Sequence, residues 1–195
     1  EILPELVAHY QILKINDILL PSYESIYYDD KDLNFYVNHH RKRLDRFKVR
    51  YRKYVESDIA FLEVKHKNKG RTDKNRIRVD SIPDKMSTND ADFVFSTGVP
   101  KQDLIEVLAN RFNRITLVAK HINERLTLDL NLSFNLDGKE EVLENVVIAE
   151  LKQANASRIS PFYSLMKQNL IRPNRISKYC IGIIKIHGKE NVRYN

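Results

Sequence analysis

Residues 46–55, RFKVRYRKYV, alternate between charged and largely apolar side chains with a period of two. This period is typical of a β-strand, because successive side chains point to opposite faces of a sheet. One face of the strand would carry the cations Arg46, Lys48, Arg50 and Arg52. The fold must therefore place this row of positive charge either in water or opposite something strongly negative.

The same alternation recurs in later segments, at residues 59–67, 71–82, 111–122, 124–134 and 144–153. Each segment has one mostly apolar face and one charged face. Together with residues 46–55, the charged faces carry the cations Arg46, Lys48, Arg50, Arg52, Lys65, Lys74, Arg76, Arg78, Arg114 and Arg125 and the acids Glu63, Asp129 and Glu150. Like charges opposite one another destabilise strand pairing, so this excess of cations needs a physical explanation.

Two architectures are compatible with this pattern. One is a single antiparallel sheet with helices on its apolar face and its charged face in water. The other is an antiparallel β-barrel, a tunnel with a polar, basic lumen and helices packed on the outside. Unpaired buried cations are costly, so such a lumen needs an anionic occupant. The preference for Arg, which grips phosphate through two parallel hydrogen bonds, favours the tunnel, in which the three acids would offer oxygen ligands to Mg²⁺ or Mn²⁺.

Other segments have helical spacing of their apolar residues, so we expect an α+β fold. The spacing predicts helices over residues 1–13, 32–43, 101–112, 160–170 and 177–187, and Ser177 is a suitable N-cap for the last. Residues 19–29 are predicted to form a strand, and residues 83–99 a loop. A chain of 195 residues without an internal repeat is expected to form one domain over residues 1–195.

The formal net charge of +7 and the pI near 9.4 favour anionic partners. Tyrosines are not interleaved with the basic strands in the way that base stacking requires, so we expect no nucleic-acid partner. The single cysteine, Cys180, excludes an intramolecular disulfide and suits a reducing compartment. Neither a signal peptide nor a membrane-spanning apolar run is evident, so a cytoplasmic location is expected.

Five stretches, in order along nearly the whole chain, resemble the VTC (vacuolar transporter chaperone) domain, and in particular a bacterial member. They are residues 27–54, 61–77, 113–134, 146–153 and 176–182, which include KVRYR, FLEVK, IAELK and ISKYC. The combination of spaced segments is specific, whereas KVRYR alone is weak. The family belongs to the triphosphate tunnel metalloenzymes, also called CYTH-like, which enclose a polar tunnel in an antiparallel β-barrel.

This resemblance implies a polyphosphate polymerase, a metal-dependent phosphotransferase that moves the γ-phosphate of ATP to a growing polyphosphate chain. Its partners would be ATP and inorganic polyphosphate, and its cofactor Mn²⁺ or Mg²⁺. The residues that match the family's catalytic positions are Arg50, Arg52, Lys65, Arg114, Arg125 and Lys178. Lys74, Arg76 and Ser177 would join them in binding phosphate, and Glu150 would bind the metal.

Some expectations remain open. The family's first strand, which adds a basic residue to the tunnel, would lie before Glu1. A tunnel triphosphatase or a nucleotide cyclase needs the same grip on a triphosphate, and a non-catalytic polyphosphate-binding module needs part of it. The residues alone do not separate these functions.

Overall fold

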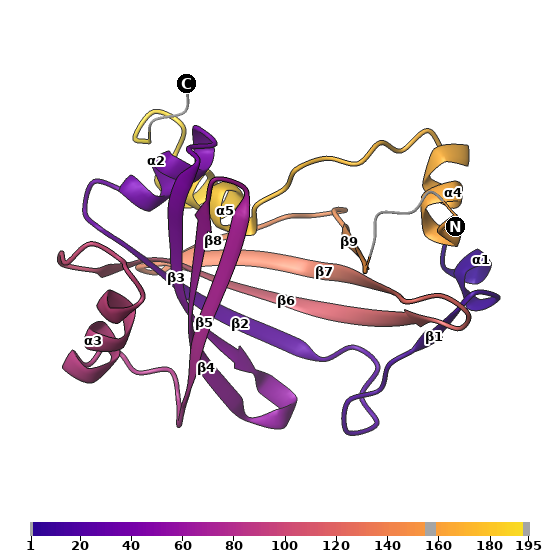
Figure 1. Ribbon diagram of the computed structural model, residues 1–195, viewed down its shortest axis with the longest axis horizontal. Helices are drawn as coiled ribbons and strands as arrows, with labels where there is room; N and C mark the ends of the chain where they lie inside the picture. The colour runs from indigo at the N-terminus through magenta and orange to yellow at the C-terminus, as the bar shows by residue number, and fades with distance from the viewer. Residues whose placement is uncertain (1, 155–158, 193–195) are drawn as a thin grey trace.

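The computed structural model describes residues 2–154 and 159–192 (Figure 1). The helices are α1 (Leu3–Val7), α2 (Asn34–His40), α3 (Thr88–Ser96), α4 (Pro161–Gln168) and α5 (Lys178–His187), with a 3-10 turn, η1 (Val55–Ser57). The strands are β1 (Tyr10–Ile12), β2 (Ser22–Asp29), β3 (Asp45–Tyr54), β4 (Ile59–Asn68), β5 (Arg71–Val79), β6 (Ile105–Ala119), β7 (Glu124–Leu136), β8 (Lys139–Val142) and β9 (Ile148–Gln153). No helix in this part of the chain is both long and apolar enough to cross a membrane.

All the strands belong to one antiparallel sheet in the order β5-β4-β3-β2-β6-β7-β8. The short strand β1 pairs with β6 beyond the end of β2, and β9 pairs with β7 beyond the end of β8. Register shifts interrupt β2–β6 at Tyr27/Tyr28 and β6–β7 at Arg111/Asn113. Such bulges add to the natural twist of a sheet, and Figure 1 shows β3–β5 crossing the direction of β6 and β7.

The expected α+β class and antiparallel sheet are confirmed, but the expected barrel is not closed by hydrogen bonds. In the residues that the structure describes, no ladder joins β5 to β8 or β9. The sheet is therefore an open one that curls around its charged face. Closure would need backbone pairing between edge strands, which side-chain alternation within each strand does not specify.

Several local predictions were wrong. Residues 101–112 were predicted as a helix, but Ile105–Ala119 is one long strand that pairs with β2 on one side and β7 on the other. The predicted helix over residues 1–13 shortens to α1 and is followed by β1. The predicted loop over residues 83–99 contains α3, whose N-cap Ser87 accepts a hydrogen bond from the Asp90 backbone N–H at 3.1 Å. In the first two cases tertiary strand pairing overrode the apolar spacing, and in the third the N-cap at Ser87 was missed.

Most helices cover the apolar face of the sheet, as expected. Val94 of α3 packs against β3 and β4, in a cluster with Val49 and Leu62. Helices α1 and α4 pack against the far ends of β6 and β7, in a cluster that includes Leu6, Phe162, Leu165, Leu117 and Leu126. These contacts explain why one face of every long strand is apolar.

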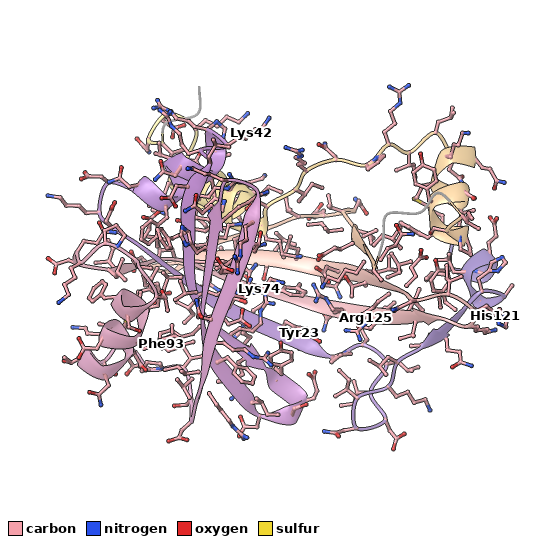
Figure 2. All side chains as sticks on the ribbon, viewed as in Figure 1. Tyr23, Lys42, Lys74, Phe93, His121 and Arg125 are labelled. Carbon is pink, nitrogen blue, oxygen red and sulfur yellow. The ribbon has the colours of Figure 1, made fainter. Side chains whose placement is uncertain are left out.

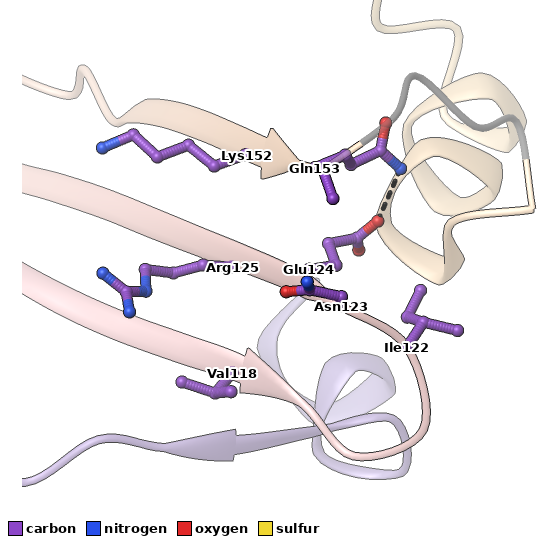
Figure 3. A pocket seen from close by; sticks show the side chains of 8 residues that line it. Val118, Ile122, Asn123, Glu124, Arg125, Lys152 and Gln153 are labelled. Atoms are coloured by element: carbon purple, nitrogen blue, oxygen red, sulfur yellow. Dashed lines mark hydrogen bonds between the residues drawn. The ribbon is translucent and has the colours of Figure 1, made fainter.

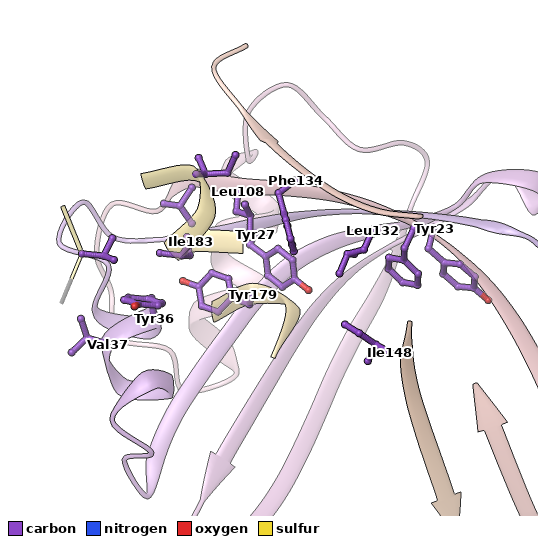
Figure 4. Packing of buried hydrophobic residues seen from close by; sticks show 14 residues of the cluster. Tyr23, Tyr27, Tyr36, Val37, Leu108, Leu132, Phe134, Ile148, Tyr179 and Ile183 are labelled. Carbon is purple, nitrogen blue, oxygen red and sulfur yellow. The ribbon is translucent and has the colours of Figure 1, made fainter. Parts of the chain in front are cut away.

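Helix α5 contradicts the prediction that all helices pack on the outside, because it lies on the charged face at one end of the sheet. Its residues Tyr179 and Ile183 share a cluster with Tyr27, Leu108 and Phe134 (Figure 4). A Cβ at Gly182 would lie closer to Leu108 and Phe134 than van der Waals contact allows. Glycine therefore permits the close approach of α5 to the sheet. The charged face is therefore capped by α5 at one end.

Candidate active site

The register of the strands places the cations of β3, β4 and β5 on one face. Residues paired directly across antiparallel strands point to the same side of a sheet. Lys48 pairs with Lys65 and then Lys74, and Arg50 with Glu63 and then Arg76. Arg114 and Arg125 extend this face on β6 and β7. We call these residues the basic face: Lys48, Arg50, Arg52, Glu63, Lys65, Lys74, Arg76, Arg78, Arg114, Arg125, Asp129 and Glu150.

Arg50 is fixed at the centre of the basic face. Its Nε and NH2 both donate to Glu63 Oε2, at 2.8 and 2.6 Å, and its NH1 donates to the Tyr27 hydroxyl at 3.2 Å. Burial raises the pKa of Glu63, but the charges of Arg50 and Arg52 outweigh it and hold the pKa below its usual range. Burial also raises the pKa of Tyr27, but the charges of Arg50 and the neighbouring cations outweigh this effect and lower the pKa. Glu63 therefore stays ionised and neutralises one of the arginines.

A second pairing joins β6, β7 and α5. Asp129 is 1% exposed and accepts hydrogen bonds from Arg114 Nε at 2.5 Å and NH2 at 2.8 Å. Lys178, at the start of α5, donates to the same carboxylate. Burial raises the pKa of Asp129, but its hydrogen bond and charge interaction with Arg114 lower it more. One carboxylate thus serves two cations that lie far apart in the sequence.

In the part of the chain that the structure describes, Arg52 forms no ion pair with a carboxylate. Its Nε donates to Ser25 Oγ at 3.2 Å, and its guanidinium lies 6.0 Å from the centre of the Phe112 ring. Burial, with the neighbouring charge of Arg50, lowers the pKa of Arg52 to about 10. The charge of Glu63 acts on this half-buried cation, but Glu63 forms its ion pair with Arg50. A buried cation without an ion pair is costly unless a ligand supplies an anion.

The N-terminus of α5 brings Ser177 and Lys178 to the basic face. Ser177 Oγ accepts from the Cys180 backbone N–H at 3.3 Å, which confirms it as the N-cap, and from Lys48 Nζ at 2.8 Å. Burial lowers the pKa of Lys48. The structure thus gathers into one region Arg50, Arg52, Lys65, Lys74, Arg76, Arg114, Ser177 and Lys178, all of which the resemblance had singled out.

Arg125 and Glu150 lie further along the face, on β7 and β9. Arg125 is exposed and, with Lys152, lines a pocket of about 320 Å³ at the end of the sheet (Figure 3). Glu150 is half-exposed, and its carboxylate lies 3.6 Å from Lys152 Nζ. Its charge also acts on Lys65 and Arg114. Lys65 is on β4, which five strand pairings separate from β9 in the sheet, so the curl brings strands from opposite ends of the sheet within electrostatic reach.

The carboxylates do not form a metal site by themselves. Among the described residues, no group of three or more His, Cys, Asp or Glu side chains could hold a metal ion. Glu63 and Asp129 are engaged in ion pairs. Mg²⁺, however, is often held by one or two carboxylates together with substrate phosphates. Glu150, the least enclosed of the three acids, fits that shared mode.

Several side chains at this site were not identified as site residues from the sequence. Lys48 was placed on the charged face but given no role, and the resemblance gave none to Tyr27 or Ser25. The strand alternation on β2, with Tyr23, Ser25 and Tyr27 in step, was a signal that could have indicated them. Asn110, which pairs with Ser25 and is 1% exposed, has no hydrogen-bond partner for its side chain in the described structure.

Comparisons with known proteins agree with this architecture. A family model described as the VTC domain matches residues 1–187. Among solved structures, a proposed adenylate cyclase from Vibrio parahaemolyticus is similar with a TM-score of 0.50 and 12% identity, over 92% of this chain and 88% of that chain. One from Bacillus halodurans has a TM-score of 0.48 and 11% identity, over 81% and 79%. No curated protein matches the sequence. At 12% identity, the Vibrio likeness shows the fold alone.

Proposed function

Because the chain belongs to the VTC domain family, a family of tunnel-type enzymes, we propose that it is a polyphosphate polymerase. In this proposal the basic face binds the triphosphate of ATP and the end of a polyphosphate chain, and the γ-phosphate passes from one to the other. The family membership supports the enzyme class. The substrates and the polymerase reaction are our proposal.

The observation that carries the proposal is the uncompensated charge around Arg52. Glu63 is already bound to Arg50, and Asp129 to Arg114 and Lys178. Among the described residues, the other cations of the face form no ion pair, and the charges of Glu63 and Glu150 act on some of them only from further away. A chain of phosphates supplies closely spaced negative oxygens, each able to accept from Arg or Lys, and so would neutralise this face.

Phosphoryl transfer requires mainly positioning and charge neutralisation from a protein. Arg50, Arg52 and Arg114 would bind the non-bridging oxygens of the triphosphate, and Arg125 would extend their grip. Lys65, Lys74, Arg76 and Lys178 would contribute further positive charge, and Ser177 would keep the start of α5 in place. These groups stabilise the negative charge that spreads over the transferred phosphoryl group.

Two further features of the reaction follow from its chemistry. The attacking group is a terminal phosphate that is already ionised, so no general base is needed. Glu150 would hold Mn²⁺ or Mg²⁺ together with the substrate phosphates, and the metal, when bound, withdraws charge from the phosphate oxygens. The Glu150 carboxylate is suited to this role because it is half-exposed on the basic face rather than enclosed in a buried ion pair.

The first test is to incubate the purified chain with ATP and Mn²⁺ and to separate the products by size. Long phosphate chains formed together with ADP would support the polymerase. Orthophosphate without chains would instead identify a triphosphatase, cyclic AMP with pyrophosphate a nucleotide cyclase, and tight polyphosphate binding without turnover a binding module. Arg52→Gln should weaken tripolyphosphate binding, and the exposed Lys101→Gln, on the α3–β6 connection, is its charge-matched control.

Glu150→Gln separates catalysis from binding. We expect activity with Mn²⁺ to be lost while affinity for metal-free tripolyphosphate stays within a few-fold of the wild type, because the arginines remain. Removal of the metal by EDTA should have the same effect on the wild type. If the variant keeps full activity, Glu150 does not hold the metal.

A further inference from the structure

A second concentration of positive charge lies at the end of the sheet that carries α2. It is formed by two segments. Residues 41–46 connect α2 to the start of β3, and residues 67–73 make the β4–β5 turn and its flanks. We call these two segments the basic rim. Its seven cations are Arg41, Lys42, Arg43, Arg46, Lys67, Lys69 and Arg71. With two acids, Asp45 and Asp73, the rim has a net charge of +5, against +7 for the whole chain.

The two segments form one surface. Asp45 pairs with Asn68, and Arg46 with Lys67, across β3 and β4. The backbone N–H of Lys69 donates to the carbonyl of Leu44 at 3.1 Å. Arg46 also reaches back to the carbonyl of Arg43. These contacts hold the cations of both segments beside one another despite their mutual repulsion.

The rim has little internal neutralisation. Asp45 is bound to His66 at 2.6 Å and Asp73 to Arg71 at 3.1 Å. Arg41, Lys42, Arg43 and Lys69 are exposed. Exposed pairs contribute little stability, so folding does not explain why this many cations lie together. A concentration of one sign of charge instead attracts a polyanion.

The rim is continuous with the basic face. Arg46 and Lys67 form the row next to Lys48 and Lys65, on the same side of the sheet. Figure 2 shows Lys42 near the top of the view, on the connection from α2 to β3, and Lys74 lower down, on β5. Six residues separate Arg46 from Arg52, a distance of about 20 Å along an extended strand. A linear chain bound at Arg52 could therefore run past the start of α5 and reach the rim.

We propose that the basic rim is an outer binding site for linear polyphosphate, which holds the part of the chain that extends beyond the basic face. The inference rests on the proposed function, since it assigns to the rim a longer form of the same ligand. An acidic membrane is the other polyanionic surface that a basic patch could bind. The rim segments expose one large apolar side chain, Leu44, whereas interfacial membrane binding usually inserts several.

The test compares short and long ligands. The rim variant is Lys42→Asn, Arg43→Gln and Lys69→Asn, and none of these residues belongs to the basic face. Lys42 and Lys69 have φ angles of 54° and 44°, in the left-handed region that Asn tolerates well. The control variant removes three exposed cations elsewhere: Lys14→Asn, Lys101→Gln and Lys167→Gln. Equal thermal stability of both variants establishes that each is folded.

Affinity is then measured for tripolyphosphate and for a long polyphosphate over a series of salt concentrations. The rim variant should bind tripolyphosphate as the wild type does, but long polyphosphate about tenfold more weakly. Its log–log salt slope for the long chain should fall by about two, as expected when three contacts to a single-stranded polyanion are lost. The control variant should keep the wild-type affinity for both.

Three results would overturn the rim as a polyphosphate site. The first is equal weakening of long-polyphosphate binding in the rim and control variants. The second is unchanged binding of long polyphosphate by the rim variant. The third is a rim variant that loses binding only to phosphatidylserine vesicles. The proposed function is tested separately by tripolyphosphate. If the wild type fails to bind it, that proposal fails, while a loss of long-chain binding specific to the rim variant would still support the rim.

Discussion

Asp129→Asn tests whether the Asp129 carboxylate occupies Arg114 and Lys178 in place of a bound anion. Asp129 is 1% exposed, and the side chains of Arg114 and Lys178 are 14% and 15% exposed. Removing one partner of a buried pair leaves uncompensated charge, which costs about 3–5 kcal/mol. Both cations retain some contact with water and Asn still accepts one hydrogen bond, so we expect the lower end, about 3 kcal/mol.

This loss should be visible in thermal unfolding. In a domain of this size, each kcal/mol shifts Tm by about 2–4 °C, so Asn should lower Tm by about 6–12 °C. Affinity for tripolyphosphate should change in the opposite direction. The substitution frees Arg114 and Lys178 for the ligand, and a gain of about tenfold would correspond to about 1.4 kcal/mol. Saturating tripolyphosphate should therefore raise Tm more in the variant than in the wild type.

Leu126→Ala is the matched control. Leu126 is fully buried on the opposite, apolar face, and its truncation should cost about 2–5 kcal/mol through loss of packing. It should lower Tm without raising affinity for tripolyphosphate. If Asp129→Asn behaves like this control, Asp129 is a structural residue only. If Tm does not change, the pairing with Arg114 and Lys178 contributes nothing to stability.

Two further predictions concern helices α2 and α5, which lie at one end of the site. Burial raises the pKa of Asp29 to about 6 although Tyr179 and backbone N–H groups of α2 donate to it. The folded state therefore binds the proton more tightly than the unfolded state. The resulting contribution to the free energy of unfolding should decline as pH rises from about 4 to about 6, and urea denaturation of Asp29→Asn at both pH values should lack that decline. Gly182→Ala should lower Tm by several degrees, because overpacking against Leu108 and Phe134 costs about 1–3 kcal/mol, and an unchanged Tm would mean that α5 shifts freely.

The sequence predicted which side chains share a face because that property is local. Successive residues of an extended strand point in opposite directions whatever the strand pairs with. The alternation at residues 46–55 therefore separated Arg50 and Arg52 from Val49 and Tyr51, and the structure places the latter pair in the core. The excess of cations on the former face was also evident from residue identities alone, and so was the resemblance to the VTC domain.

Apolar spacing was a weaker guide where pairing partners decide the structure. Residues 101–112 have the spacing of a helix, but their backbone hydrogen bonds go to β2 and β7. The alternation also could not indicate whether the sheet closes. Closure depends on twist, on bulges and on which edges meet, and these are properties of the assembled sheet.

The partners of the charged groups were decided by tertiary structure alone. Lys178 meets Asp129 because α5 packs on the basic face, and that packing depends on Gly182 fitting against β6 and β7. The sequence determined that this protein carries a basic face and an apolar one, because alternation is a property of the strand backbone. Among the described residues, the structure decided which cations form ion pairs and which, like Arg52, form none, because such pairing joins residues far apart in the chain.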